Sequence, residues 1–408
     1  MNQRTLLITL SGPDRPGVTS RLFSVLSGFP VVVVDVEQVV IRGRLTLGVL
    51  VAYAGDTPTG TGGTLGALWT AVERTAGDLG LEVELSTGSD LQEKRRRGRL
   101  HVTVLGSPLQ PAAMAGIAGR IAAAGANIDR IERLSNYPVT CFELAVSGAD
   151  PDTLRAELAT EAYAQQVDVA VQRSGLHRRA KRLIVMDVDS TLIQAEVIEL
   201  LAAHAGCLEE VARVTEEAMR GELDFAESLR RRVALLKGLS EETFEKVRKE
   251  LVLTPGARTL VRTLKRLDYR FAIVSGGFTQ LTDALVEELG IDYSAANTLE
   301  VVDGVLTGRV VGEIVDRPGK ARALERFARE AGIPISQTVA IGDGANDLDM
   351  IAAAGLGIAF NAKPVVRKAA DTAVNVPYLD AILYLLGIPR AEVEAADAED
   401  GVTVVERR

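Results

Sequence analysis

The stretch LIVMDVDSTLI (residues 183–193) places two carboxylates, Asp187 and Asp189, directly after an apolar run. Such a run is typical of a buried strand in a parallel sheet. Three further apolar runs alternate with helical patterns, at residues 271–275, 338–342 and 356–360. This alternation predicts an α/β domain with a doubly wound parallel sheet over residues 182–408.

Polar side chains fall at the carboxyl ends of the predicted strands, where doubly wound sheets bind ligands. Asp187 and Asp189 follow the first strand, and Ser275 ends the second. Asp343 follows the third strand, and Lys320 precedes the helix that leads into it. Converging carboxylates repel each other unless a cation lies between them, and oxygen ligands suit Mg²⁺. The pattern therefore predicts a site for Mg²⁺ and a phosphoryl group, whose oxygens Ser275 and Lys320 would neutralise.

Each of these residues has a plainer interpretation when it is taken alone. An Asp after a strand usually caps a helix or forms a turn, and a lone Lys is usually a surface charge. Ser275 could likewise cap a helix. The occurrence of all of them at strand ends favours a phosphoryl-transfer site. The stretch from about 195 to 258 shows helical patterns and no strand pattern, so we expect a helical cap over the site.

The N-terminal part of the chain contains a repeat. LLITLSG (6–12) matches LHVTVLG (100–106) at an offset of 94 residues. Each copy follows the order strand, helix, strand, strand, helix, strand, which predicts two βαββαβ ferredoxin-like domains. Two basic runs, EKRRRGR (93–99) and RSGLHRRAKR (173–182), are interpreted as solvated linkers or, alternatively, as anion-binding patches. The predicted domains are residues 1–92, 99–172 and 182–408.

Composition restricts the class of protein. The 408 residues include only 4% aromatic residues and carry a net charge of −9 at pH 7, so we expect no binding of nucleic acid. No apolar stretch reaches the roughly 20 residues that span a bilayer, and the first apolar run is too short for a signal peptide. We therefore expect a cytoplasmic protein that does not associate with membranes.

The turn LSGPDRPGV (10–18) precedes a predicted helix and leaves backbone amides free to hold a small carboxylate. With this turn, the duplicated fold resembles tandem ACT domains, the amino-acid-sensing modules of many metabolic enzymes. The resemblance implies that Asp14 and Gly17 of the first copy are regulatory residues. The second copy, with LGSPLQPAA (105–113), lacks the Asp-Arg-Pro-Gly turn but has Asn127 before its second strand. Either copy is therefore a candidate ligand site.

The C-terminal segment also resembles a known family. DVDST, VSGGF, the Lys320 segment and GDGAND resemble the four motifs of the haloacid-dehalogenase superfamily of phosphotransferases. DVDSTLIQAEVIELLA, EAMRGELDFAESLRRRVALLKGL and AIVSGGF are similar to the phosphoserine phosphatases, and the two preceding ACT-like domains match their long bacterial form. The resemblance implies Mg²⁺-dependent hydrolysis of O-phospho-L-serine to L-serine and phosphate, the last step of serine biosynthesis.

The resemblance assigns chemical roles to the acidic residues. Asp187 would be the nucleophile that forms an aspartyl-phosphate. Asp189 would be the general acid for the leaving serine oxygen and then the base for water. Mg²⁺ would bind the side chain of Asp187, the backbone carbonyl of Asp189 and the side chain of Asp343, and Asp347 would support these ligands.

The resemblance also assigns the residues around the phosphoryl group. Lys320, Ser275 and the backbone at Gly276 would bind its oxygens. Asn346 would either contact the phosphate or orient Lys320.

Substrate selectivity is expected to come from the cap. A helix over residues 224–239 would carry Phe225, Leu229, Arg232 and Leu236 on one face. A charged residue on an otherwise apolar face is either a long side chain at its edge or a binding residue. The resemblance implies that Arg232 binds the substrate carboxylate as a planar fork and that Glu196 binds its ammonium group. Phe225 and Met219 would cover the site, although both would otherwise be interpreted as core residues.

Two alternatives stay open from the sequence. The same machinery could act on another small phosphorylated metabolite, such as phosphohomoserine or a sugar phosphate. The chain could also be a non-catalytic amino-acid sensor that uses its ACT pair. Arg232 with Glu196 favours an amino-acid substrate, and the complete set of catalytic residues favours an enzyme. Because ACT modules expose sheet edges, we expect a homodimer, with L-serine as a possible effector.

Overall fold

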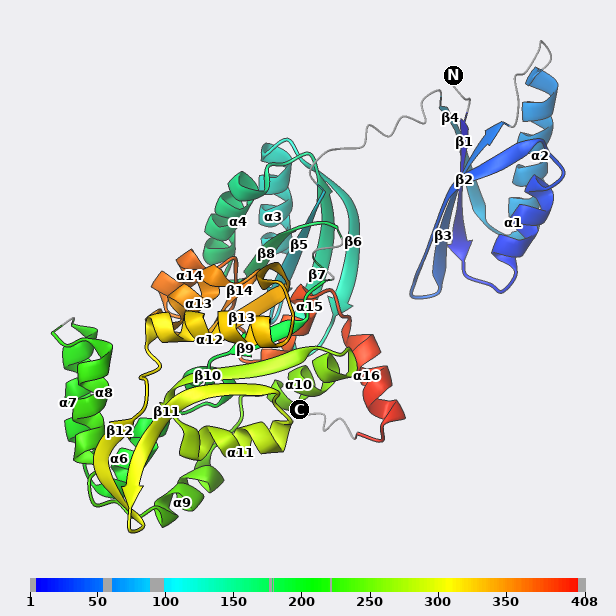
Figure 1. Ribbon diagram of the computed structural model, residues 1–408. Coiled ribbons are helices and arrows are strands. Elements are labelled where there is room, and N and C mark those ends of the chain that lie inside the picture. The colour runs from blue at the N-terminus through cyan, green and yellow to red at the C-terminus, as the bar shows by residue number, and fades with distance from the viewer. Residues whose placement is uncertain are drawn as a thin grey trace. The chain divides into compact units, whose positions relative to one another are not determined.

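The computed structural model of the chain describes residues 5–53, 61–88, 99–175, 178, 180–220 and 222–402. The chain divides into two compact units, residues 1–96 and 97–408 (Figure 1). Their boundary falls in the first basic run, for which the linker prediction lies outside the described residues except at Arg99.

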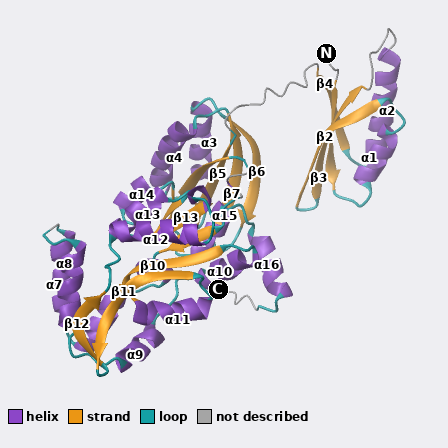
Figure 2. Ribbon diagram, in the orientation of Figure 1, coloured by secondary structure: helices purple, strands orange, loops and turns teal. Residues whose placement is uncertain are grey.

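The first unit is a four-stranded antiparallel sheet with two helices on one face (Figure 2). Alternate residues of its first strand, Leu6, Ile8 and Leu10, are buried against Leu22 and Leu68 of the helices. This is the period-two pattern of a half-buried sheet. The strands lie in the order β2-β3-β1-β4, and the elements are β1 (Thr5–Pro13), α1 (Val18–Leu26), β2 (Val31–Ile41), β3 (Arg44–Tyr53), α2 (Thr61–Leu79) and β4 (Glu82–Gly88).

The edge strand β2 of this unit exposes an apolar surface. Every residue of β2 after Val31 is exposed, and β2 pairs with β3 alone within its sheet. Its exposed large apolar residues are Val32, Val33, Val34, Val36, Val39, Val40 and Ile41. A long apolar edge strand is a template for pairing with another strand.

The second unit begins with a domain of the same fold, which confirms the predicted repeat. Its strands lie in the order β6-β7-β5-β8. The elements are β5 (Leu100–Gly106), α3 (Pro111–Ala123), β6 (Asn127–Ser135), β7 (Thr140–Ser147), α4 (Pro151–Gln165) and β8 (Asp168–Arg173). One face packs on α3 and α4 through Val102, Val104 and Leu144.

The other face of this second sheet packs against the C-terminal domain. Leu105 and Cys141 are fully buried in the same apolar cluster as Tyr384 and Leu385 of that domain. The cluster is continuous, so residues 97–408 share one interior.

The C-terminal domain contains the predicted parallel sheet, so the α/β prediction is confirmed. Its strands lie in the order β12-β11-β10-β9-β13-β14-β15, with β12 antiparallel to β11 and the others parallel. The strands are β9 (Leu183–Met186), β10 (Arg270–Phe278), β11 (Tyr293–Val302), β12 (Val305–Val311), β13 (Thr338–Gly342), β14 (Gly357–Phe360) and β15 (Thr372–Val374).

Helices cover both faces of this sheet, as in a doubly wound fold. Leu183 and Val185 of β9 face α12, α13 and α14. Ile184 and Met186, which point the other way, face α10, α11 and α15. These helices are α10 (Ala257–Arg266), α11 (Thr279–Leu289), α12 (Arg317–Glu330), α13 (Leu348–Ala353), α14 (Pro364–Ala369) and α15 (Ile382–Leu385), with α16 (Arg390–Glu399) following.

Four helices lie between β9 and α10 at one end of the domain (Figure 1): α6 (Val197–Ala205), α7 (Leu208–Met219), α8 (Phe225–Leu235) and α9 (Glu242–Glu250). The β11–β12 hairpin, which the sequence analysis did not predict, reaches these helices. Backbone hydrogen bonds of 2.9 Å join Gly238 and Leu239 to Leu306, and Glu241 to Gly304. The cap helices are therefore attached to the sheet by this hairpin as well as by their own linkers.

The linker prediction for the second basic run is wrong for two of its residues. Arg178 is 7% exposed, forms an ion pair with Glu143 and donates to Gln172 Oε1 at 3.2 Å. Lys181 is buried, and its Nζ donates to Ser336 O at 2.7 Å. Burial lowers the pKa of Lys181 to about 8. These two side chains bind groups inside the second unit, so they are not available as an anion-binding patch.

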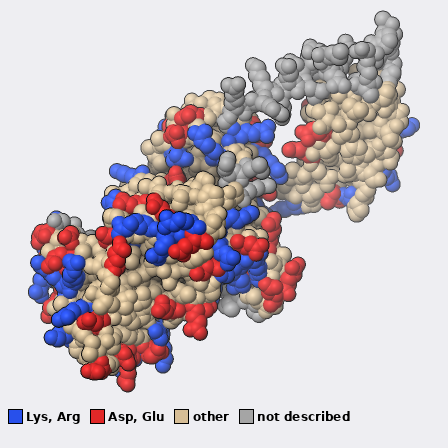
Figure 3. All heavy atoms as spheres, in the orientation of Figure 1, with Lys and Arg blue, Asp and Glu red and all other residues tan. Residues whose placement is uncertain are grey.

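On the face shown in Figure 3, Lys and Arg side chains are interspersed with Asp and Glu. Among the described residues, no helix is both long and apolar enough to span a bilayer.

Candidate active site

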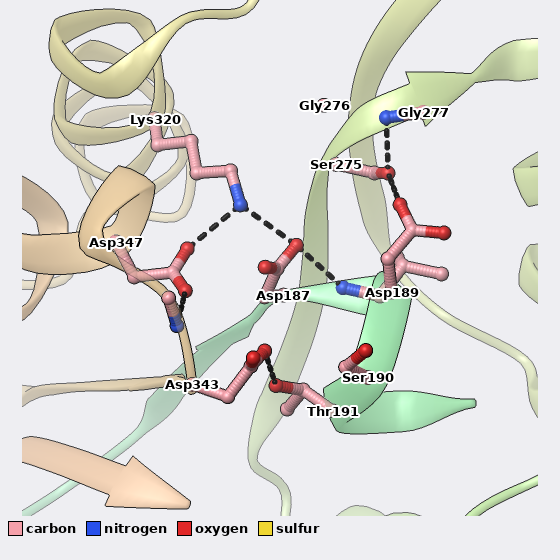
Figure 4. Close-up of polar contacts among 12 residues, drawn as sticks. Asp187, Asp189, Ser190, Thr191, Ser275, Gly276, Gly277, Lys320, Asp343 and Asp347 are labelled. Carbon is pink, nitrogen blue, oxygen red and sulfur yellow. Dashed lines mark hydrogen bonds and ion pairs between the residues drawn. The ribbon is translucent and has the colours of Figure 1, made fainter. Parts of the chain in front are cut away.

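Three carboxylates meet at the carboxyl ends of two neighbouring strands (Figure 4). Asp187 follows β9 and Asp343 follows β13, and these strands pair in the sheet. Asp347 ends the short helical turn Ala345–Asp347 that comes next. One carboxylate oxygen of each residue lies within 4.8 Å of those of the other two. The sheet topology therefore brings Asp187 together with acids that lie 156 and 160 residues later in the sequence.

Lys320 lies among these acids and is 1% exposed. Its Nζ is 2.7 Å from Asp187 Oδ1 and 2.7 Å from Asp347 Oδ1. The other oxygen of Asp347 accepts a hydrogen bond from Gly344 N at 3.0 Å. Burial alone would lower the pKa of Lys320, but the two carboxylates outweigh burial and raise it. The lysine is therefore a fixed positive charge.

The three carboxylates outnumber the single ammonium group. Burial and the neighbouring Asp347 raise the pKa of Asp187, which Lys320 opposes. Burial raises the pKa of Asp343 to about 6, although the hydroxyl of Thr191 donates to Asp343 Oδ1 at 2.9 Å. A set of hard oxygen donors with excess negative charge, of which Asp187 and Asp347 are buried and Asp343 is half-buried, fits a divalent cation. Such a cation would stabilise the ionised forms of Asp187 and Asp343.

Asp189 is held apart from the three clustered acids. Its Oδ1 accepts from Val197 N at 2.8 Å, and its Oδ2 accepts from the hydroxyl of Ser275 at 3.1 Å. Burial, followed by the charge of Glu196, raises the pKa of Asp189 to about 6. Ser190, which follows Asp189 in the turn Val188–Leu192, has a left-handed backbone with φ of 57°. The turn thus directs two acids that are one residue apart into different surroundings.

The Ser275–Gly277 segment of β10 packs closely against the site. Gly277 N donates to Ser275 Oγ at 2.7 Å, and a Cβ on Gly277 would be 3.0 Å from Asp189 Oδ2. A Cβ on Gly276 would be 3.2 Å from the ring of Phe225. A side chain at Gly276 would therefore crowd Phe225, and one at Gly277 would crowd Asp189.

Phe225, at the start of α8, therefore extends from the cap over Gly276. Arg232 of the same helix is half-buried, whereas Arg230 and Arg231 are exposed. Burial lowers the pKa of Arg232, and the charges of Glu196 and Asp189 oppose this effect. Arg232 therefore lies within reach of the charges of Glu196 and Asp189.

The remaining predicted substrate residues lie at the border of the site. Glu196 is exposed and accepts a hydrogen bond from Ser190 Oγ at 2.7 Å. Asn346 is half-buried, and its Oδ1 would be 2.1 Å from a Cβ on Gly344. The side chain of Met219, the last residue of α7, lies outside the described residues.

The predicted regulatory residues occur in the two ACT-like domains. Asp14 is exposed, and its backbone amide donates to Gly43 O at 2.8 Å. Gly17 precedes α1 with φ of 93° and has open space around it. Asn127 begins β6 and donates to Asp129 Oδ1 at 2.7 Å.

Two site residues were not predicted. Thr191 is fully buried beside Asp343, and its place in the quoted motif is a signal that could have identified it. Asn297 of β11 is fully buried, donates to Gly276 O at 2.8 Å and accepts from Val315 N at 2.8 Å. The sequence around Asn297 gives no signal for this role, because its hydrogen-bond partners are distant in the chain and its strand was not predicted.

Comparisons with known families agree with this geometry. The sequence profile of the haloacid dehalogenase-like hydrolases matches residues 184–352. Two ACT domain profiles match residues 4–86 and 100–172. A haloacid dehalogenase family hydrolase from Salmonella enterica is similar in structure, with a TM-score of 0.63 and 27% identity over 70% of this chain and 98% of its own.

Full-length relatives carry a more specific name. A phosphoserine phosphatase of Streptomyces coelicolor is 63% identical, over 96% of this chain and 94% of its own. One from Mycobacterium tuberculosis is 54% identical over 98% of both chains. The unliganded structure of a probable phosphoserine phosphatase from Vibrio cholerae has a TM-score of 0.58 and 39% identity, over 76% of this chain and 91% of its own. The chain therefore belongs to the phosphoserine phosphatase family, in the form in which two ACT domains precede a haloacid dehalogenase-like hydrolase domain.

Proposed function

We propose that the chain hydrolyses O-phospho-L-serine to L-serine and phosphate, the last step of serine biosynthesis in the cytoplasm. The observation that carries this proposal is the contrast between two adjacent acids. Asp187 lies against the Lys320 ammonium at 2.7 Å, whereas Asp189 is held by Ser275 and Val197 N. Lys320 and a bound cation would favour the ionised form of Asp187 against the effects of burial and Asp347, whereas Asp189 is placed to exchange a proton.

In the first step, Asp187 acts as the nucleophile. Its Oδ1 accepts from Val188 N at 2.7 Å and pairs with Lys320, while Oδ2 has no hydrogen bond to any described residue. Oδ2 forms a bond to phosphorus as the bond from phosphorus to the serine oxygen breaks. Protonated Asp189 gives its proton to that oxygen, and L-serine leaves.

In the second step, Asp189 acts as the base. Now ionised, it removes a proton from a water molecule that attacks the aspartyl-phosphate, which releases phosphate and regenerates Asp187. A pKa of about 6, raised chiefly by burial, suits a group that must both give and take a proton near neutral pH.

Phosphoryl oxygens would be bound by Lys320, Ser275, the backbone at Gly276 and Asn346. Lys320 is already held by two carboxylates, so we assign Asn346 to the phosphate. Mg²⁺ would be held by the Asp187 and Asp343 side chains and the Asp189 carbonyl, with Asp347 supporting them. When bound, the ion offsets negative charge on the phosphoryl group.

The cap would select an amino acid. We assign Arg232 to the substrate carboxylate and Glu196 to its ammonium group, with Phe225 and Met219 covering the site. The charges of Glu196 and Asp189 act on Arg232, so a positive and a negative group suited to an amino acid lie close enough to each other to interact. This pairing distinguishes phosphoserine from a sugar phosphate.

Turnover of phosphorylated amino acids, phosphohomoserine and sugar phosphates with Mg²⁺ tests the substrate. Phosphoserine should give the highest kcat/KM. Asp187→Asn should form no phosphoenzyme, whereas Asp349→Asn, whose half-buried carboxylate pairs with Arg317, should stay active. Normal turnover by Asp187→Asn would refute the nucleophile assignment, and no turnover of any substrate would favour a sensor.

Arg232→Met tests selectivity against Arg231→Met, its exposed neighbour on the same helix. Loss of the fork should cost about 2–5 kcal/mol toward phosphoserine, because a desolvated carboxylate is left unpaired. It should cost much less toward p-nitrophenyl phosphate, which has no such carboxylate. Equal losses on both substrates would indicate a structural role.

We also propose that the chain forms a homodimer and binds L-serine at an ACT domain. The exposed apolar strand β2 supports an association between copies. The GPDRPG turn before α1 supports a site for the amino-acid carboxylate near Asp14. Sedimentation of the full chain with and without L-serine, compared with Asp14→Ala, tests both parts. A monomer at all concentrations, or identical serine responses of the two proteins, would contradict them.

A further inference from the structure

The two linkers of the cap form one short ribbon. The chain leaves the core after Ile193 and returns at Leu253, and these two residues form an antiparallel bridge. Gln194 N donates to Val252 O at 2.9 Å, and Thr254 N donates to Leu192 O at 2.9 Å. The returning linker is therefore hydrogen-bonded to the turn that carries Asp189.

Thr254 reaches this turn with its side chain as well. It is 6% exposed, and its Oγ1 donates to Thr191 O at 2.7 Å. Thr191 is fully buried, and its own Oγ1 donates to Asp343 Oδ1 at 2.9 Å. Two successive hydrogen bonds thus connect the returning cap linker to a carboxylate of the acidic cluster.

The core holds Thr254 from its other side. Ala257 N, at the start of α10, donates to Thr254 O at 3.0 Å, and Leu379 N donates to Pro255 O at 2.7 Å. Helix α10 packs on the sheet through Leu260 and Leu264. Thr254 therefore stands between a rigid element and the turn, where its hydroxyl can fix the position of the Thr191 carbonyl.

We propose that Thr254 is a positioning residue for catalysis. Its hydroxyl fixes the peptide after Thr191, so that the Thr191 hydroxyl stays directed at Asp343 and the neighbouring turn keeps Asp189 in place. It also joins the cap linker to these groups, so that the position of the cap and the geometry of the carboxylates are set together. The turnover measurements rest on the proposed phosphatase function, whereas the metal-binding measurement does not.

Thr254→Val tests this proposal, because it keeps the shape of the side chain and removes the hydroxyl. Thr254→Ser restores the donor and should recover most of the lost function. The matched control is Thr263→Val in α10, a buried threonine whose hydroxyl has no hydrogen-bond partner among the described residues. The control should behave like the wild type or be slightly more stable.

We expect Thr254→Val to lower kcat for phosphoserine about 10-fold to 100-fold, with a small change in KM. Calorimetric titration with Mg²⁺ alone should show affinity about 10-fold weaker, because a group that orients a ligand has been released. Thr254→Ser should stay within a few-fold of the wild type in both measurements, because the serine hydroxyl can still donate to Thr191 O.

Three results would overturn the proposal. The first is a Thr254→Val protein with normal kcat and Mg²⁺ affinity, even if it melts at a lower temperature. The second is equal loss in Thr254→Val and Thr263→Val, and the third is no recovery in Thr254→Ser. If Thr254→Val does not fold, Thr254→Cys replaces it, because a thiol is a weaker donor. Its kcat and Mg²⁺ affinity should then lie below those of Thr254→Ser but above zero, and unchanged values would refute the proposal. If the wild type hydrolyses no phosphoserine, the proposed function fails, but the Mg²⁺ titration still decides the role of Thr254.

Discussion

The two ACT domains have the same fold and strand order but different surroundings. The first buries its own cluster, which includes Leu6 and Leu68, and belongs to a unit that ends at residue 96. The second places Leu105 and Cys141 in the cluster of the phosphatase domain. One copy is therefore built as a separate module, whereas the other shares its apolar interior with the catalytic domain.

The largest expected effect comes from cutting the chain at the two domain junctions. A protein of residues 97–408 should fold and keep phosphatase activity, because it contains the whole shared interior. A protein of residues 182–408 should be poorly soluble and strongly destabilised, because the surface around Tyr384 and Leu385 loses its apolar cover. Thermal melting and yield of both fragments measure this difference. Equal stability of the two fragments would show that the shared interior is dispensable.

Removing the charge of Arg178 should destabilise the packing between the second ACT domain and the C-terminal domain, by less than the truncation does. Arg178→Ala leaves Glu143, which is 13% exposed, with His101 as its remaining partner, so the free energy of unfolding should fall by about 3 kcal/mol. Arg120→Ala removes an arginine whose side chain is 49% exposed from its pair with Glu161 in the same domain. Glu161 keeps a hydrogen bond from Gln165, so this change should cost less than about 1 kcal/mol. Urea unfolding of residues 97–408 gives both values. Similar costs for the two variants would show that burial of the Arg178 pair is unimportant.

Acid should weaken the shared interior through Glu143. Burial would raise the pKa of Glu143, but hydrogen bonds from His101 and Arg178 outweigh burial and lower it below its usual value of 4.5. The stabilisation is thus complete above that usual value and is lost as the pH falls through the lowered one. Melting temperatures of residues 97–408 between pH 3 and 6 should fall less steeply in Glu143→Gln, and parallel curves would contradict this.

A helix cap gives the smallest expected effect. Asp150 caps α4 of the second ACT domain, and its side chain accepts from Thr153 N at 3.0 Å. In the first domain, α1 is preceded by Gly17, which offers no side-chain cap. Asp150→Ala should lower the free energy of unfolding by about 1 kcal/mol. Gly17→Ala should also lower the free energy of unfolding, but because alanine is strained at the left-handed φ of 93°. Urea titration measures both, and no loss in Asp150→Ala would mean that water replaces the cap.

Much of the fold follows from local patterns. The alternation around Leu6 and the run before Asp187 specify strands because apolar spacing encodes which face is buried. The β11–β12 hairpin was missed because most of its residues are only partly buried, and strand β15 because it has only three residues. Neither gives a strong pattern in sequence.

Contacts between distant segments could not be predicted from the sequence. A basic run such as that around Arg178 usually faces solvent. Only the fold shows that Glu143 lies close enough to Arg178 to form an ion pair. The hydrogen bonds of Thr254 and Asn297 join segments that are 63 and 21 residues apart. The motif acids were found because each follows a strand, whereas the groups that orient them carry no comparable signature.

The ribbon at residues 192–194 and 252–254 makes the cap resemble an insertion cassette. Because its two ends leave the core side by side, a different helical lid could be spliced at Gln194 and Val252 without altering the strands that hold the acids. The β11–β12 hairpin sets a condition on such a graft, since its bonds to Gly238 and Glu241 belong to this lid. A change of substrate in this architecture would therefore require the lid and the β11–β12 hairpin to be exchanged together.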